Sequence, residues 1–226
     1  MTDLGLGPDI EEVYNELGIV VSIINRSPVI TNQKILYDLN AQGTKPFIEE
    51  HFLNCSFPYN TPLETGDVLQ IIETGTYHMV MNKIPELFEN KIVEYSGVIY
   101  LCNLPITAHI IRPIEIRDKT SYNMISGWHA VVDAPIYSLI SDRVFGSNLE
   151  TGVMIGQDQV WRIDLYIPKF YDIRPLDRIV ISPIEYYKVE TILTYNYPGV
   201  NVALLVEDTR PMHIMIGDEV YPDDEY

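Results

Sequence analysis

Short apolar segments separated by turn residues run through most of the chain, and this pattern predicts β-strands rather than long helices. Valine, isoleucine and 16 tyrosines supply many of the apolar positions, and 15 prolines and 13 glycines are scattered among them. The first group favours strands and the second favours tight turns. We therefore expect a mainly β protein.

One segment near the start has helical spacing instead. Asp9 can cap the first turn of a helix, and Gly18 supplies a left-handed stop. The apolar residues that share one face of this helix are Ile10, Val13 and Leu17. Residues 1–18 are expected to form a helical arm. Its apolar face packs either on the chain's own domain or on a neighbouring subunit, and the sequence leaves both open.

The most informative feature is an internal repeat with an offset of 110 positions. Residues 53–58 align with 163–168, and residues 67–71 align with 177–181, without gaps. The match keeps the apolar positions, a proline and an aspartate while most other positions differ, as two copies of one buried pattern would. Each copy reads as a strand ending at a proline, a short loop and a hairpin. We expect two tandem small antiparallel β-barrels related by internal duplication.

The expected domain limits follow from this repeat. The first barrel is placed at residues 19–115 and the second at 116–217, followed by an acidic tail at 218–226. Charged residues break the apolar pattern at the join. Two hairpin-like excursions, at 82–97 and 141–156, extend beyond the repeated unit.

Charge excludes several classes of function. The chain of 226 residues has 32 acidic and 15 basic residues, a net charge of −17. Such a charge opposes binding to nucleic acid, because that affinity rests largely on lysine and arginine.

No apolar run approaches the roughly 20 residues of a membrane span, so no membrane association is expected. Cys55 and Cys102 lack the paired spacing of zinc or redox motifs, which favours buried thiols and a reducing folding environment.

Patterns typical of catalysis and metal binding are missing from the sequence. The five histidines are too far apart for a metalloprotease motif, and Gly-x-Ser-x-Gly, the phosphate loop and the dinucleotide fingerprint are absent. Asp67 and Asp177 occupy equivalent positions of the repeat, where a carboxylate favours turn capping over catalysis. The acidic tail lacks the alternation of a calcium loop. We expect neither an enzyme nor a cofactor or metal site.

Tyrosine also anchors contacts between proteins. Besides the helix face, the candidate subunit or partner contacts are Tyr171, Tyr195 and Tyr197 of the second half, and Asp223 and Asp224 of the tail. Packing between strands accounts for the same tyrosines, and this alternative stays open.

Three segments of the second half form a pattern that covers roughly residues 160–210. They are Ile173-Arg-Pro-Leu-Asp-Arg-Ile-Val-Ile181, Tyr187-x-Val189 and Val202-Ala-Leu-Leu-Val-Glu-Asp-Thr-Arg210. This pattern resembles the head–tail joining proteins of tailed bacteriophages, the head-closure or stopper components of the neck. The simplest members of that family carry one barrel, whereas two are expected here.

The resemblance implies a structural virion protein that is made in the host cytoplasm. It would form a homo-oligomeric ring between portal or adaptor and tail proteins, and viral DNA would pass through the lumen without specific binding. Acidic walls suit such a passage because they repel phosphates. The candidate gating loop contains Ser147, Asn148, Glu150 and Gln157. Alternatives are a tail-tube, tail-terminator or baseplate protein of the same kind of virus, a cellular binding module, or an unrecognised hydrolase.

Overall fold

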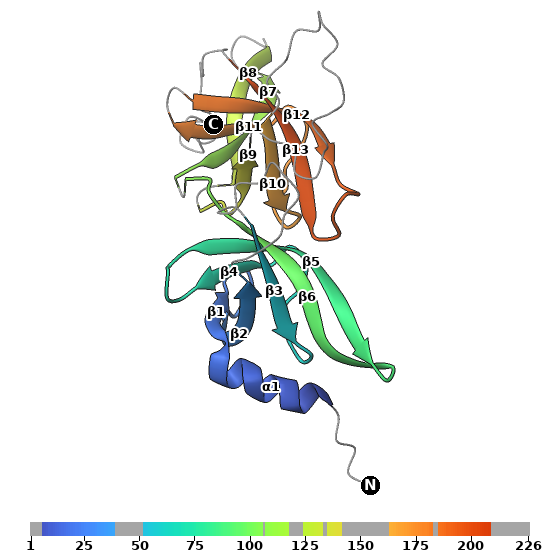
Figure 1. Cartoon of the computed structure of the whole chain (residues 1–226). Coiled ribbons are helices and arrows are strands. Elements are labelled where there is room, and N and C mark those ends of the chain that lie inside the picture. Colours follow the sequence, from blue (N-terminus) through green and yellow to red (C-terminus); the bar gives the residue numbers. More distant parts are fainter. Residues whose placement is uncertain are drawn as a thin grey trace, which may run out of the picture.

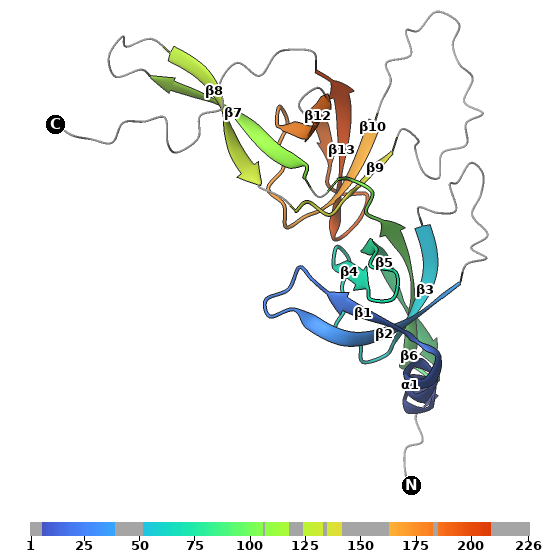
Figure 2. The same cartoon turned by 90° about the vertical axis from the view of Figure 1, so that its left-hand side faces the viewer.

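The computed structural model describes residues 6–38, 52–105, 107–117, 124–132, 135–141, 163–182 and 185–208. Over these residues the chain forms one helix, α1 (Leu6–Leu17), and thirteen strands. Figures 1 and 2 show two halves stacked one on the other, with α1 at the outer end of the first half. The chain is thus mainly β with a short N-terminal helix, as predicted.

The first half is a closed six-stranded antiparallel barrel with the order β1-β2-β3-β6-β5-β4. Its strands are β1 (Ile19–Ile23), β2 (Ile30–Asp38), β3 (Phe52–Pro58), β4 (Val68–Ile71), β5 (Tyr77–Phe88) and β6 (Lys91–Leu101). Every strand contributes to one apolar core, which includes Val21, Ile35, Phe57, Leu69, Val80 and Ile99. This half agrees with the expected small barrel.

The second half is an open seven-stranded antiparallel sheet over the described residues, and this corrects the expectation of a second closed barrel. The order is β8-β7-β11-β12-β13-β10-β9. Its strands are β7 (His109–Arg117), β8 (Met124–Val132), β9 (Leu139–Ser141), β10 (Ile163–Pro168), β11 (Arg178–Ser182), β12 (Glu185–Leu193) and β13 (Val200–Glu207). A separate core covers one face and includes Ile110, Leu165, Ile179, Val189 and Leu205.

The order of the strands nevertheless repeats between the halves. Around the barrel it reads β2-β1-β4-β5-β6-β3, and across the sheet it reads β8-β7-β11-β12-β13-β10. The register repeats as well. Cys55 of β3 pairs with Tyr37 of β2, and Leu165, which lies 110 positions later, pairs with Ile140 of β9 on the equivalent side. The offset found in the sequence therefore relates strands in equivalent positions.

The halves differ in the strand that closes the barrel. β2 is continuous over nine residues and pairs with β1 through its first part and with β3 through its last part. In the second half these roles are divided between β8, which pairs with β7, and β9, which pairs with β10. Pro135 lies between β8 and β9 and lacks the N–H that a continuous ladder requires. This interruption accounts for the open sheet.

The join between the halves lies earlier in the sequence than expected. β6 ends at Leu101 and belongs to the barrel, whereas β7 begins at His109 and pairs with β11 of the second sheet. Residues 109–115, expected in the first barrel, therefore belong to the second half. Glu115 lies within β7 and is exposed, so this charged residue belongs to a strand and does not mark a linker.

An apolar interface joins the two halves. The barrel contributes Phe52, Met79, Met81 and Tyr100, and the second sheet contributes Leu139, Tyr166, Val200 and Val202, all of them buried. The rings of Tyr100 and Tyr166 meet edge to face across it, with their centroids 5.6 Å apart. Because residues of both halves share one core, the halves pack as a single body.

The backbones of two turns also meet at this interface. Gly66 precedes β4 in the barrel, and Gly199 precedes β13 in the second sheet. A Cβ atom on Gly199 would collide with the carbonyl of Thr65, and one on Gly66 would collide with the carbonyl of Gly199. Gly66 also has a φ of 88°, which other residues rarely adopt. The turn that contains Gly199 therefore has a packing role between the halves.

Helix α1 begins at Leu6, three residues before Asp9, and docks on the barrel through an unexpected face. Its buried residues are Gly7 and Tyr14. The Tyr14 hydroxyl donates a hydrogen bond to Oε2 of Glu94 on β6, at 2.8 Å. Burial and this contact raise the pKa of Tyr14. Tyrosine serves here because its ring packs on the barrel while its hydroxyl still finds an acceptor.

The predicted apolar face of α1 points largely to solvent. Ile10 is half-buried, whereas Val13 and Leu17 are 44% and 70% exposed. Leu6 lies on the same side of the helix and is 43% exposed. We call Leu6, Val13 and Leu17 the helix stripe.

β5 and β6 continue past the barrel as a hairpin, which we call the arm (residues 82–97). The strands pair up to Phe88 and Lys91, and the two-residue turn Glu89-Asn90 has positive φ angles of 49° and 62°. Such angles are typical of a type I′ turn, which suits the twist of a hairpin. Figure 1 shows the arm projecting beyond the body of the barrel. The first predicted excursion is therefore a hairpin.

Candidate functional site

Asp67 stands at the turn before β4 and is almost fully buried. Its Oδ2 accepts a hydrogen bond from the backbone N–H of Glu64 at 2.8 Å, which is the contact that a turn-capping carboxylate makes. Arg26, from the loop after β1, donates two further hydrogen bonds to the same carboxylate, through Nε at 3.0 Å and Nη2 at 2.9 Å. The carboxylate thus ties the turn to the neighbouring loop.

Asp177 repeats this arrangement before β11 and has no exposed surface. Its Oδ2 accepts the backbone N–H of Arg174 at 2.7 Å. Arg112 of β7 donates to it through Nε at 2.8 Å and Nη2 at 2.9 Å. Arg112 also contacts Asp172 at 3.0 Å. The pKa of the Arg112 guanidinium is raised mainly by the hydrogen bonds to Asp177.

We call these two arrangements the Asp–Arg clamps. Each carboxylate is held by a two-pronged arginine contact and by a backbone N–H, so at least three of its roughly four lone-pair sites are occupied. The clamps are therefore suited to fix the turns and not to transfer protons. The sequence showed both aspartates through the repeat. It did not show Arg26 and Arg112, because they lie outside the aligned segments and 86 positions apart.

His78 and the two cysteines, Cys55 and Cys102, lie in the interior of the described structure. His78 is buried in β5, and burial lowers its pKa to about 4. Cys55 lies in the barrel core, where burial raises the pKa of its thiol, and Cys102 packs at the interface between the halves. Neither thiol has the lowered pKa of a nucleophile. Within the described ranges, no group of three His, Cys, Asp or Glu side chains could hold a metal ion.

Arg178 is a buried charge that sequence reasoning did not single out. Its guanidinium stacks on Trp128 at 4.1 Å and on Tyr186 at 4.7 Å from the ring centroids. Its Nη2 donates to Oδ2 of Asp208 at 2.6 Å. The contact joins β11 to the end of β13, which is a structural role.

The tyrosines predicted to make external contacts have three different environments. Tyr171 is 9% exposed and packs in the core of the second half, and its hydroxyl contacts the backbone of Tyr137 and Pro135. It is therefore a core residue and not a subunit contact. Tyr197 is half-buried at the interface between the halves, with its ring 6.1 Å from that of Tyr166. Tyr195 is 99% exposed and available for a contact.

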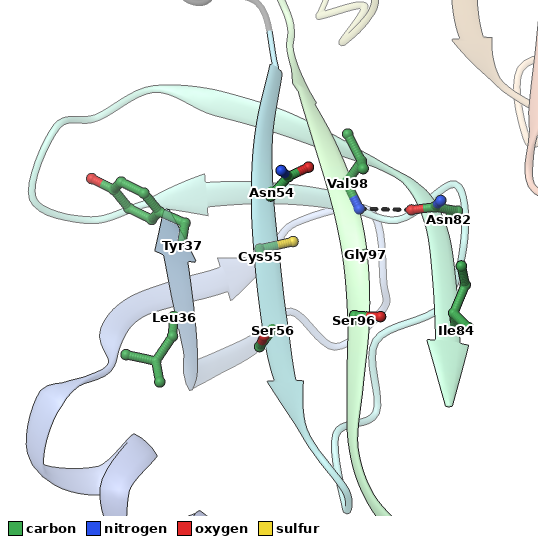
Figure 3. Close-up of a pocket in the computed structure, with 10 residues that line it drawn as sticks. All are labelled: Leu36, Tyr37, Asn54, Cys55, Ser56, Asn82, Ile84, Ser96, Gly97 and Val98. Carbon is green, nitrogen blue, oxygen red and sulfur yellow. Dashed lines mark hydrogen bonds between the residues drawn. The ribbon is translucent and has the colours of Figure 1, made fainter. Parts of the chain in front are cut away.

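One cavity is a trough on the outer face of the barrel, with a volume of about 490 Å³. Leu36, Ser56, Ser96 and Ile84 pair side by side across β2, β3, β6 and β5. Figure 3 shows Leu36 and Ile84 at the two sides, with the two serines between them. Small residues in the middle and large ones at the sides make the surface concave.

A β-bulge in β5 lies beside the trough. The register shifts between Val80 and Asn82, and Oδ1 of Asn82 accepts the backbone N–H of Val98 at 2.6 Å (Figure 3). A Cβ atom on Gly97 would lie 2.5 Å from the carbonyl oxygen of Asn82 and 2.7 Å from the ring of Phe57. Amides, hydroxyls and apolar groups line the trough, with no acid–base pair. It can hold a side chain or a small molecule.

Several predicted site residues lie outside the described residues. They are the gating-loop residues Ser147, Asn148, Glu150 and Gln157 and the tail residues Asp223 and Asp224. The structure therefore gives no account of them.

The fold and these sites define a mainly β protein built from a closed six-stranded barrel and an open seven-stranded sheet with a similar strand order. Comparison with models of protein families, with curated proteins and with solved structures finds no match for the chain. In the parts of the chain that the structure describes, no helix is long and apolar enough to cross a membrane.

Proposed function

We propose that the chain is a structural subunit of a tailed-bacteriophage neck, forming a ring between portal or adaptor and tail that continues the DNA channel. The observation that carries the proposal is the placement of the three resembling segments. In their described parts they cover the turn before β11 and parts of β11, β12 and β13, which are consecutive neighbours in the second sheet. The resemblance thus belongs to one contiguous antiparallel unit.

We also propose that the two halves arose by internal duplication of such a unit. The repeated strand order, the equivalent register at Cys55 and Leu165 and the paired Asp–Arg clamps all support a common ancestor. The clamps are the most specific of these, because in both halves a buried aspartate stands before the equivalent strand and accepts the backbone N–H three residues earlier, although the arginines that complete the clamps come from different elements. The interrupted strand between β8 and β9 is then a later change in one copy.

The charge agrees with a channel subunit. Residues 1–113 hold 14 acidic and 6 basic residues, and residues 114–226 hold 18 and 9, so both halves are strongly negative. Acidic walls repel the phosphates of passing DNA.

The Asp–Arg clamps fix two turns, and the apolar interface joins the two halves. Such packing suits a structural subunit of a virion.

One observation favours the alternative, a tail-tube, tail-terminator or baseplate subunit of the same kind of virus. Among the described pairings, β8 has a neighbour on one edge only. A free edge can pair with a strand of another subunit, as a tube built from continuous sheets would require.

Electron microscopy of the purified chain and of particles labelled on it tests the proposal. We expect closed rings with a central hole, and label at the vertex between capsid and tail. Label along the tail or at its tip would favour the alternative. A monomer bound to no particle would refute both.

A further inference from the structure

The turn that Asp67 caps is closed by backbone hydrogen bonds. The N–H of Asp67 donates to the carbonyl of Glu64 at 3.1 Å, and the N–H of Gly66 donates to the carbonyl of Val80 at 2.8 Å. The N–H of Val80 donates back to the carbonyl of Asp67 at 2.9 Å. The third residue, Gly66, has a φ of 88°, and a positive φ at this place is typical of a type II turn. We call residues 64–67 the Gly66 turn.

The second half contains the same turn at residues 174–177, which we call the Leu176 turn. The N–H of Asp177 donates to the carbonyl of Arg174 at 3.1 Å, and the N–H of Leu176 donates to the carbonyl of Val189 at 2.8 Å. The N–H of Val189 donates back to Asp177 at 2.8 Å. The third residue is Leu176, with a φ of 75°. The two turns therefore share their hydrogen bonds and differ in having glycine or leucine at the third residue.

Backbone conformation alone does not account for the glycine at position 66. Leucine adopts a similar left-handed φ at position 176, although this region is strained for a residue with a side chain. The difference lies in what each residue meets. The side chain of Leu176 is 55% exposed, whereas a Cβ atom on Gly66 would collide with the carbonyl of Gly199 in the other half. From the other side, a Cβ atom on Gly199 would collide with the carbonyl of Thr65.

We propose that the Gly66 turn is the docking site through which the first half receives the second, and that the absence of a side chain at position 66 is what permits docking. The occupant of the site is the turn of the same chain that contains Gly199. The Leu176 turn is closed to a contact of this kind, because its third residue carries a side chain. The contact lies within one chain and is therefore independent of the proposed ring.

The Gly66 turn is held too firmly to move aside for a side chain. Arg26 grips the carboxylate of Asp67 through two hydrogen bonds, and Oδ1 of Asn25 accepts the N–H of Val68 at 2.9 Å. On its other side, Nζ of Lys83 donates to the carbonyl of Leu63 at 2.7 Å. These contacts all come from the first half, so they fix the turn in its own barrel.

The turn that contains Gly199 is also fixed. The carbonyl of Gly199 accepts the N–H of Lys169 at 3.0 Å, and Nζ of Lys169 donates to the carbonyl of Pro198 at 2.8 Å. The next residue, Val200, is buried in the apolar interface between the halves. A side chain at position 66 can therefore be accommodated only if the halves move apart, and that movement would pull Val200 out of the interface.

Exchange of the third residue between the two turns tests the proposal in the full chain. Gly66→Leu gives the Gly66 turn the residue found in the other half, and Leu176→Gly makes the reciprocal change. Gly75→Leu is the matched control, because Gly75 has a φ of 69° and a Cβ atom there would have no neighbour within 4 Å. It adds the backbone strain without the collision. Gly199→Ala approaches the contact from the other side, at a residue without a positive φ.

Two measurements report whether the halves stay docked. Small-angle X-ray scattering gives the radius of gyration, and thermal unfolding is followed by circular dichroism and by tryptophan fluorescence. Both tryptophans, Trp128 and Trp161, come after residue 109 in the sequence, so fluorescence follows the second half, whereas circular dichroism follows the strands of both. Wild type should unfold in one transition with coincident midpoints, because the halves share a core.

We expect Gly66→Leu to have a larger radius of gyration than wild type and a melting temperature several degrees below that of Gly75→Leu. Its two unfolding curves should separate, because each half has its own core and can unfold alone once undocked. Gly199→Ala should shift the same quantities in the same direction. Leu176→Gly should keep the wild-type radius and a single transition.

Other results have a defined meaning. If Gly66→Leu matches Gly75→Leu in radius, midpoint and coincidence of the two curves, the proposed docking site is overturned. If Gly66→Leu does not fold at all, Gly199→Ala decides: separated curves support the docking site, and an unshifted single transition overturns it. None of these results bears on the ring, which electron microscopy tests separately.

Discussion

The clamp at Asp177 provides the sharpest test of how the fold is held together. Replacing Arg112 by glutamine removes two charged hydrogen bonds, at 2.8 and 2.9 Å, from a carboxylate with no exposed surface. Removing one partner of a buried ion pair costs about 3–5 kcal/mol, because the other charge stays buried and unpaired. Arg112 itself is 21% exposed, so water can partly replace it. We expect a loss of about 3 kcal/mol in the free energy of unfolding.

The equivalent change in the first half serves as an internal comparison. Arg26 is 34% exposed and Asp67 is 5% exposed, so Arg26→Gln should cost less, about 1–2 kcal/mol. For a chain of this size 1 kcal/mol corresponds to roughly 2–4 °C in melting temperature. Thermal and urea unfolding of both variants measure the difference. Equal losses, or a loss below about 1 kcal/mol for Arg112→Gln, would show that the buried clamp does not stabilise its turn as argued.

Three further predictions concern buried groups. The pKa of His78 falls from 6.5 to about 4 on folding, because the buried side chain favours its neutral form. The free energy of unfolding should therefore be highest above pH 6.5 and should fall by about 3 kcal/mol as the pH falls toward 4. Urea unfolding of His78→Phe should lack this acid-dependent loss, and identical pH profiles for the variant and the wild type would contradict the prediction. Gly199→Ala should lower the melting temperature by several degrees, because the added Cβ would collide with the carbonyl of Thr65 and overpacking costs about 1–3 kcal/mol. An unchanged melting temperature would rule out the close approach of the two turns. Cys55 should resist a thiol reagent at pH 8 until the protein unfolds, because burial raises its pKa; rapid labelling of the native protein would show that the barrel core opens.

The α1 helix shows where sequence reasoning stopped. Spacing predicted a helix at the right place, because capping and stop residues act locally. It assigned the docking face to Ile10, Val13 and Leu17, since apolar residues usually face the core. The barrel offers Glu94 as an acceptor at the docking site, and a tyrosine hydroxyl meets it. That pairing spans 80 positions and cannot be read from helical spacing.

The clamps show the same division. A repeated aspartate at an offset of 110 positions indicated two equivalent turns, and both turns are found. The arginines that complete them come from different parts of the two halves, from a loop in one and from β7 in the other. Only pairing between distant strands brings Arg26 and Arg112 to the carboxylates.

The sequence by itself determined the mainly β class, the short helix, the arm and the equivalence of the two halves. These depend on periodicity, turn residues and repetition, which are local properties of the chain. Tertiary structure decided that one half closes into a barrel and the other forms an open sheet over the described residues, because closure depends on whether a single strand can pair with neighbours on both sides. It also decided which apolar residues are shared between the halves and which remain exposed, since burial is a property of the assembled surfaces.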